Sequence, residues 1–138
     1  MYGLDINFDY DFTKEYRFKY ESQCDCAYCI NYYKTFKEKY PKTSKFLEEF
    51  GLDIGFPLEI MPLEYDKMDN EMEYTSYYPV KGTMDKDELI LNSDGIEVRV
   101  FKGSDLNNPC PNPKMGEPYL IIEISEIRLP WILDEDVE

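Results

Sequence analysis

The chain contains no histidine, and this absence removes a large class of catalytic sites. Ser-His and Cys-His pairs are excluded, because no imidazole is present to activate a nucleophile. The sequence also lacks the Gly-x-Ser-x-Gly motif, the phosphate-binding P-loop and the Gly-x-Gly-x-x-Gly dinucleotide fingerprint. Its many carboxylates cannot be sorted into a glycosidase pair without their geometry. The sequence therefore favours a non-catalytic protein over an enzyme.

Long apolar runs are absent as well. No stretch of about 18 apolar residues occurs, so no membrane-spanning helix is expected. Residues 1–5 contain neither a basic segment nor an apolar one of the kind that starts a secretory signal. We therefore expect a cytoplasmic protein with reduced thiols. Its 138 residues fit a single domain spanning 1–138 with a hydrophobic core of its own.

Basic side chains are scarce: 15 Lys and Arg stand against 29 Asp and Glu, for a formal net charge of −14. Residues 14–45 carry eight basic and four acidic side chains, whereas residues 46–138 carry seven and 22. Residues 134–138 form an acidic C-terminal tail. Direct nucleic-acid binding is disfavoured, because affinity for phosphates depends on Lys and Arg. A basic partner surface is favoured, although an acidic surface can also serve solubility alone.

Three of the four cysteines fall within six residues, at the expected start of a helix. Free N–H groups and the helix dipole lower thiol pKa values at such a position. Because structural zinc takes four ligands, we expect one Zn ion bound by Cys24, Cys26, Cys29 and Cys110, with Asp25 as the alternative fourth ligand. Inert, partly buried thiols explain the cluster equally well. Redox chemistry at Cys26 and Cys29 is a weaker alternative, as are disulfides.

The hydrophobic pattern changes its period along the N-terminal half. Residues 3–12 alternate apolar and polar side chains, and residues 16–20 alternate again, which predicts a hairpin or a long bent strand. Residues 27–40 then show the spacing of an amphipathic helix, and a second helix is predicted over 42–50. Pro41 ends the first helix and suits the first turn of the second.

Two local signals are specific for turns. Gly51 suits the position after the C-terminal cap of the second helix, and Leu52 can supply the hydrophobic contact that accompanies such a cap. The dipeptide Asp94-Gly95 between two alternating segments predicts a tight β-hairpin.

The remaining pattern predicts an α+β fold. Strands are expected at residues 58–61, 73–80, 87–91, 95–101 and 119–128. Pro62 and Pro79 mark edge or interrupted strands, because proline has no N–H to donate to a sheet. We expect an antiparallel sheet of about six strands, with the two helices inserted after the first hairpin and packed on one face. Residues 103–118 are expected to form a long loop, which a metal bond at Cys110 would anchor.

Acidic side chains recur along two expected strands, and they suggest a binding surface. The candidate partner-binding residues are Asp5, Asp9, Asp11, Glu64, Asp66, Asp69, Glu71, Glu73, Tyr77 and Tyr78. Rows of carboxylates about 6.6 Å apart can imitate nucleic-acid phosphates, and tyrosine is favoured at interfaces. A solvated acidic face is the simpler interpretation. We expect an interaction or inhibitor protein for a basic, nucleic-acid-binding partner; the alternative is a thiol redox or Cys-dependent enzyme using Cys26 and Cys29.

Overall fold

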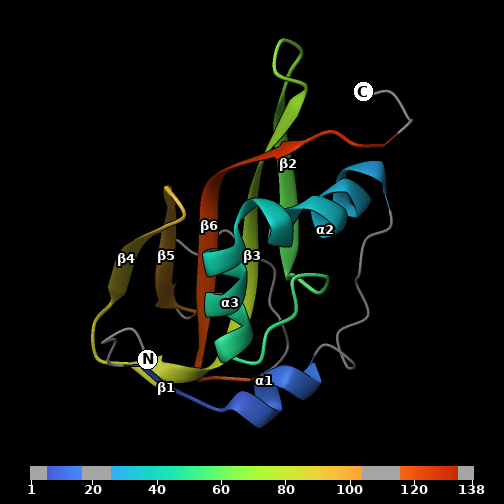
Figure 1. Ribbon diagram of the computed structural model, residues 1–138. Coiled ribbons are helices and arrows are strands. Elements are labelled where there is room, and N and C mark those ends of the chain that lie inside the picture. Colours follow the sequence, from blue (N-terminus) through green and yellow to red (C-terminus); the bar gives the residue numbers. More distant parts are fainter. Residues whose placement is uncertain (1–5, 17–25, 104–115, 134–138) are drawn as a thin grey trace.

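A curled antiparallel sheet, covered on one face by two helices, forms the centre of the molecule (Figure 1). The computed structural model describes residues 6–16, 26–103 and 116–133. The helices are α1 (Tyr10–Tyr16), α2 (Ala27–Lys39) and α3 (Pro41–Glu49). The strands are β1 (Ile6–Phe8), β2 (Glu59–Asp66), β3 (Glu71–Met84), β4 (Glu88–Ser93), β5 (Ile96–Lys102) and β6 (Tyr119–Pro130). The predicted α+β class with an antiparallel six-stranded sheet is confirmed.

The 14-residue strand β3 organises the sheet. The strand order is β1-β3-β6-β5-β4, and β2 pairs with β3 on the edge opposite β6. The same edge of β3 therefore carries β2 along residues 71–77 and β1 along residues 82–84. Pro79 lies in the interval between these two partner strands, where its missing N–H leaves no ladder bond unmade.

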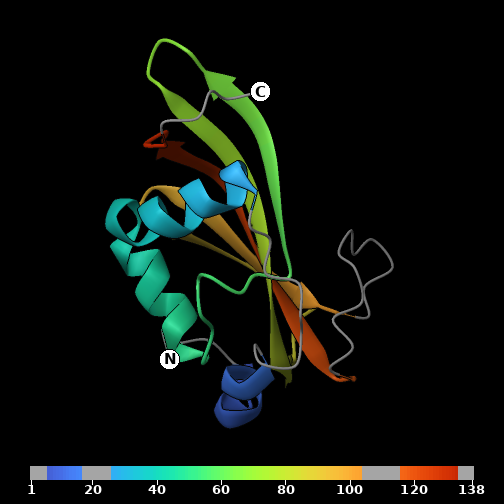
Figure 2. The same cartoon turned by 90° about the vertical axis from the view of Figure 1, so that its right-hand side faces the viewer.

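The hydrophobic core lies between the sheet and the pair α2 and α3, which Figure 2 shows on the concave side of the sheet. The inward side chains of β3 include Met72, Tyr74, Tyr78 and Val80, all buried. The two helices and the cap residues that follow them supply Tyr32, Phe36, Tyr40, Phe46, Leu47 and Phe50. Burial of each such side chain contributes about 1.5–3 kcal/mol, so this layer supplies most of the stabilising energy of the fold.

The two predicted helices are confirmed, and their observed ends lie within one residue of the predicted ones. Pro41 occupies the first turn of α3, where its fixed backbone angle favours the helix. At the other end, the Gly51 N–H donates to the Glu48 carbonyl (2.9 Å) and the Leu52 N–H to the Leu47 carbonyl (3.2 Å). These two bonds form a Schellman motif, which requires the positive φ of +91° found at Gly51.

A hydrogen-bonded group of tyrosines crosses the core. The Tyr32 hydroxyl lies 2.7 Å from the Tyr78 hydroxyl and 2.9 Å from the Ser76 hydroxyl. Tyr78 donates in turn to the Ile54 carbonyl (2.9 Å), and so attaches the loop after α3 to the centre of β3. Burial raises the pKa of both phenols above the ordinary value, which keeps them neutral donors.

The N-terminal prediction is wrong, because residues 10–16 form a helix and not a strand. Asp9 begins this helix: its Oδ1 accepts the Phe12 N–H at 3.0 Å. Thr13 and Tyr16 are the buried residues of α1, and the helix packs against β3. The first strand is only three residues long and pairs with the far end of β3, so the described segment forms no hairpin before α2.

The hairpins of the C-terminal half are regular. Asp94 and Gly95, with φ of 54° and 81°, make the predicted two-residue turn between β4 and β5. The segment 64–71, predicted to separate two strands, is instead their hairpin, because β2 runs to Asp66 and β3 begins at Glu71. The predicted long loop lies largely in residues 104–115, outside the described part of the chain. None of the described helices is both long and apolar enough to cross a membrane.

Candidate functional site

The β2–β3 hairpin carries four of the predicted acidic residues on one face. Because Met72 and Tyr74 point into the core, the alternating residues Glu71 and Glu73 point to the opposite, outer face of the sheet. The register places Glu64 opposite Glu73 and Asp66 opposite Glu71. Figure 1 shows this hairpin extending beyond the helices at one end of the molecule. The predicted row therefore exists as two cross-strand pairs of carboxylates.

One of these pairs is neutralised within the molecule. Arg128 on β6 donates from Nη2 to Asp66 (2.8 Å) and from Nε to Glu71 (3.2 Å), and Lys39 of α2 lies 3.4 Å from Glu71. The pKa of the Asp66 carboxyl lies below its ordinary value. The largest cause is the hydrogen bond that the carboxylate accepts from the backbone N–H of Asp69, and the second is the hydrogen bond from Arg128. Asp66 and Glu71 therefore serve to hold three strands together.

The other pair has no such compensation. Arg128 is the register partner of Glu73, yet it directs its guanidinium to Asp66 and Glu71. Among the residues that the structure describes, neither Glu64 nor Glu73 has a cationic partner. Like charges directly opposite each other on a sheet destabilise it, by about 0.2–1 kcal/mol. The fold thus retains a repulsive pair in which Glu64 is exposed and Glu73 is half-buried.

Apolar side chains are exposed beside this pair. Met61 and Leu63 on β2 are 38% and 50% exposed, and Met68 in the turn is 96% exposed. The register shifts between Pro62 and Glu64, and an irregularity of this kind bends the strand locally. We use the name hairpin outer surface for Met61, Leu63, Glu64 and Glu73. It combines negative charge with apolar area, as the centres and rims of protein interfaces do.

The other predicted acids do not join this surface. Asp69 is exposed in the hairpin turn, and its backbone N–H donates to Asp66 at 3.3 Å. Asp9 caps α1 and Asp11 lies exposed in its first turn. Figure 1 shows α1 at the end of the molecule far from the hairpin turn. Their predicted common strand face is wrong, since α1 replaces the strand. Asp5 lies outside the described residues.

The two predicted interface tyrosines are buried. Tyr78 is completely inaccessible in the core, and Tyr77 is 5% exposed on the opposite face of the sheet. There Tyr77 packs with Leu58, Phe101 and Ile121 in a second hydrophobic cluster. Both tyrosines are therefore residues of the protein interior, and their assignment to the partner-binding surface is wrong.

Two arginines on the outer face of the sheet were not predicted from the sequence to neutralise acids there. Arg99 on β5 bonds Glu88 and lies 3.2 Å from Glu123, and its guanidinium stacks over Phe101 at 4.6 Å. Like Arg128, it neutralises a pair of outer-face acids. Both arginines could be found in the sequence only with the strand register known, because their partners are up to 62 residues away.

The cysteine cluster is only half described. Cys26 is exposed just before α2, and Cys29 is 4% exposed inside that helix. Cys24 and Cys110 lie outside the described residues. Within the described ranges no three His, Cys, Asp or Glu side chains are grouped as metal ligands. The zinc site and the redox alternative therefore both stay predictions: exposed Cys26 is accessible for attack, and a buried Cys29 is compatible with either a ligand or a resolving thiol.

The comparisons with known proteins add no relative from which a function could be inferred. No family model matches the chain, and neither a curated protein nor a solved structure is significantly similar to it.

Proposed function

We propose that this chain is a non-catalytic interaction protein that binds a basic partner through the hairpin outer surface. The observation that carries the proposal is the opposed pair Glu64 and Glu73, which has no cationic partner in the described chain. A Lys or Arg of a partner placed between the two carboxylates would replace a repulsion by two attractions. The repulsion between the two carboxylates is removed only in the complex, so its removal contributes to the free energy of binding.

The surroundings of the pair favour side-chain docking over strand addition. Pro62 has no N–H, and the register shift between Pro62 and Glu64 interrupts the outer edge of β2. Both features protect an edge strand against pairing with another chain. Met61 and Leu63 offer apolar contact area next to the charges. The partner surface that fits is therefore basic at its rim, with an apolar depression for these two side chains.

Imitation of nucleic acid is the more specific form of this proposal. Along β2 and β3 the acids recur at every second residue, a spacing of about 6.6 Å, and four carboxylates meet within two strands. Arg128 and Lys39 reduce this charge without cancelling it. A protein that binds nucleic acid through a basic groove would then be inhibited by competition. We further propose that the chain acts in the cytoplasm. We also propose that its cysteines bind zinc and thereby stabilise its fold.

The experiment is a pull-down from native lysate with the wild-type chain, quantified at low and at high salt. The test variant is Glu64→Gln with Glu73→Gln. The matched control is Glu38→Gln with Asp85→Asn, which changes the net charge equally at exposed sites that do not belong to the β2–β3 hairpin. We expect basic, nucleic-acid-binding proteins to be recovered at low salt by wild type and control, and much less by the test variant.

Two results would contradict the proposal. Equal loss of capture in the test and control variants would show that net charge alone is responsible. A bound set that is unchanged at high salt and unchanged by both variants would show that the acids take no part. The mimicry form requires in addition that nucleic acid and the chain compete for the recovered protein, and co-purification of all three would exclude it.

A further inference from the structure

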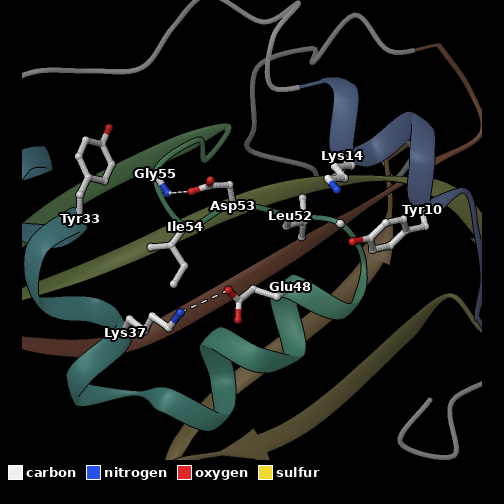
Figure 3. A pocket seen from close by; sticks show the side chains of 10 residues that line it. Tyr10, Lys14, Tyr33, Lys37, Glu48, Leu52, Asp53, Ile54 and Gly55 are labelled. Atoms are coloured by element: carbon white, nitrogen blue, oxygen red, sulfur yellow. Dashed lines mark hydrogen bonds and ion pairs between the residues drawn. The ribbon is translucent and has the colours of Figure 1, made fainter.

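A cleft on the helical side of the molecule, remote from the hairpin outer surface, has the properties of a small-molecule site. Its volume is about 540 Å³, and it lies where α1, α2, α3 and the loop 51–55 meet. Figure 3 shows the side chains that surround it. Clefts of this size suit small organic ligands. We refer to it as the helical cleft.

The helical cleft is held open by the backbone. The Schellman motif fixes Gly51 and Leu52, and the Asp53 carboxylate accepts the Gly55 N–H at 2.8 Å. Tyr78 holds the Ile54 carbonyl from beneath. α1 contacts the loop so closely that a Cβ on Gly51 would lie 2.7 Å from the Tyr10 carbonyl oxygen. A preformed cleft of this kind binds a ligand without a large ordering cost.

The charges of the cleft are unequally matched. Lys37 lies 3.6 Å from Glu48, and Asp53 is engaged with the loop backbone. Lys14, in contrast, lies 5.8 Å from the centre of the Tyr10 ring and has no carboxylate partner among the described residues. In a chain of net charge −14, a lysine in a cleft that has no carboxylate partner can pair with an anionic ligand.

The apolar part of the cleft lies beside this lysine. Leu52 and Ile54 are 8% and 9% exposed and form its floor. Figure 3 shows Tyr10 and Lys14 projecting from α1 on one side of that floor, with Lys37 and Glu48 across from them. The Tyr10 ring adds a flat surface whose centre lies 5.8 Å from the Lys14 ammonium, and the Tyr10 hydroxyl adds a donor to the cleft.

We propose that the helical cleft binds a small aromatic anion, with the anionic group at Lys14 and Tyr10 and the ring over Leu52 and Ile54. Each part of the ligand has a complementary group in the cleft. The anionic group would pair with Lys14, and the ring would pack on the apolar floor. The proposal is independent of the partner-binding surface, because the two sites share no residue.

The test is a titration of the ¹⁵N-labelled chain with phenyl phosphate at constant ionic strength. We expect saturable shifts of the amides of residues 51–55. Phenol and inorganic phosphate, each with half of the required chemistry, should bind more weakly. Lys14→Gln should weaken phenyl phosphate binding on the order of tenfold, as expected for loss of a charged hydrogen bond. The matched control Lys45→Gln removes the same charge from an exposed position of α3 outside the cleft.

Three results would overturn the proposal: no saturation up to about 10 mM, which lies beyond the weak millimolar affinities of small ligands; equal weakening by Lys14→Gln and Lys45→Gln; or shifts located away from residues 51–55. Glu64→Gln with Glu73→Gln should leave phenyl phosphate binding unchanged. The outcome for the helical cleft and the outcome for the partner-binding surface can therefore be distinguished.

Discussion

Replacing Tyr78 by phenylalanine tests the buried tyrosine group most simply. The change leaves the ring in place but removes the hydroxyl that donates to the Ile54 carbonyl at 2.9 Å. The Tyr32 hydroxyl also loses its contact at 2.7 Å and keeps only Ser76. A buried polar group left without a partner costs about 1–3 kcal/mol. At about 2.1 cal/mol/K per residue, a 138-residue chain that loses 2 kcal/mol should melt about 7 °C lower.

The assay is thermal unfolding followed by circular dichroism, with urea unfolding as a second measure of the free energy. Tyr65→Phe is the matched control: its hydroxyl donates to Asn70 at an exposed position, where water can replace the bond. The control should stay within about 0.5 kcal/mol of wild type. Partner capture should not change in either variant. An unchanged melting temperature for Tyr78→Phe, or loss of capture without loss of stability, would refute the assignment of Tyr78 to the interior.

Further predictions concern pH, the loop after α3 and the thiols. Burial raises the pKa values of Tyr32, Tyr74 and Tyr78, so the contribution of these three phenols to stability should be constant below pH 10 and fall above it by about 4 kcal/mol per pH unit; phenolate absorbance corresponding to all 13 tyrosines before unfolding would contradict this. Gly51→Ala should cost about 1–3 kcal/mol more than Gly95→Ala in urea unfolding, because only its Cβ meets backbone. Metal analysis should find about one zinc per chain, and a chelator should lower the melting temperature; four freely titratable thiols in the native chain would disprove the zinc site.

Local signals in the sequence predicted the elements that depend on local chemistry. Pro41 and Gly51 marked the helix boundaries because their effect on the backbone needs no distant partner. Asp94-Gly95 likewise determined its hairpin. The local pattern does not decide the structure of residues 10–16. Tyr10, Thr13 and Tyr16 have the spacing of a helix face, whereas Tyr10 and Phe12 have the spacing of a strand face. The Asp9 cap and the contact with β3 decide for the helix.

The position of the hairpin outer surface could be predicted from the sequence. Which of its acids lack a cationic partner could not be predicted. Alternation along β3 was enough to group Glu71 with Glu73, but the distant Arg128 determines which acids remain without a cation. The same limit applies to the tyrosines. Tyr77 and Tyr78 point to opposite faces, and both faces are covered at that level, which alternation in a single strand cannot reveal.

We propose that Glu64 and Glu73 bind a basic partner, and that their mutual repulsion lowers the stability of the free chain. The most direct test of this proposal measures two quantities on Glu64→Gln with Glu73→Gln: the free energy of unfolding in urea, and the association rate with the basic protein captured by wild type. Stability should rise by about 0.2–1 kcal/mol as the cross-strand repulsion disappears. Association should slow by about threefold to tenfold at low salt. A loss of stability would contradict the repulsion, and an association rate equal to that of Glu38→Gln with Asp85→Asn would show that the pair has no role in binding of this kind.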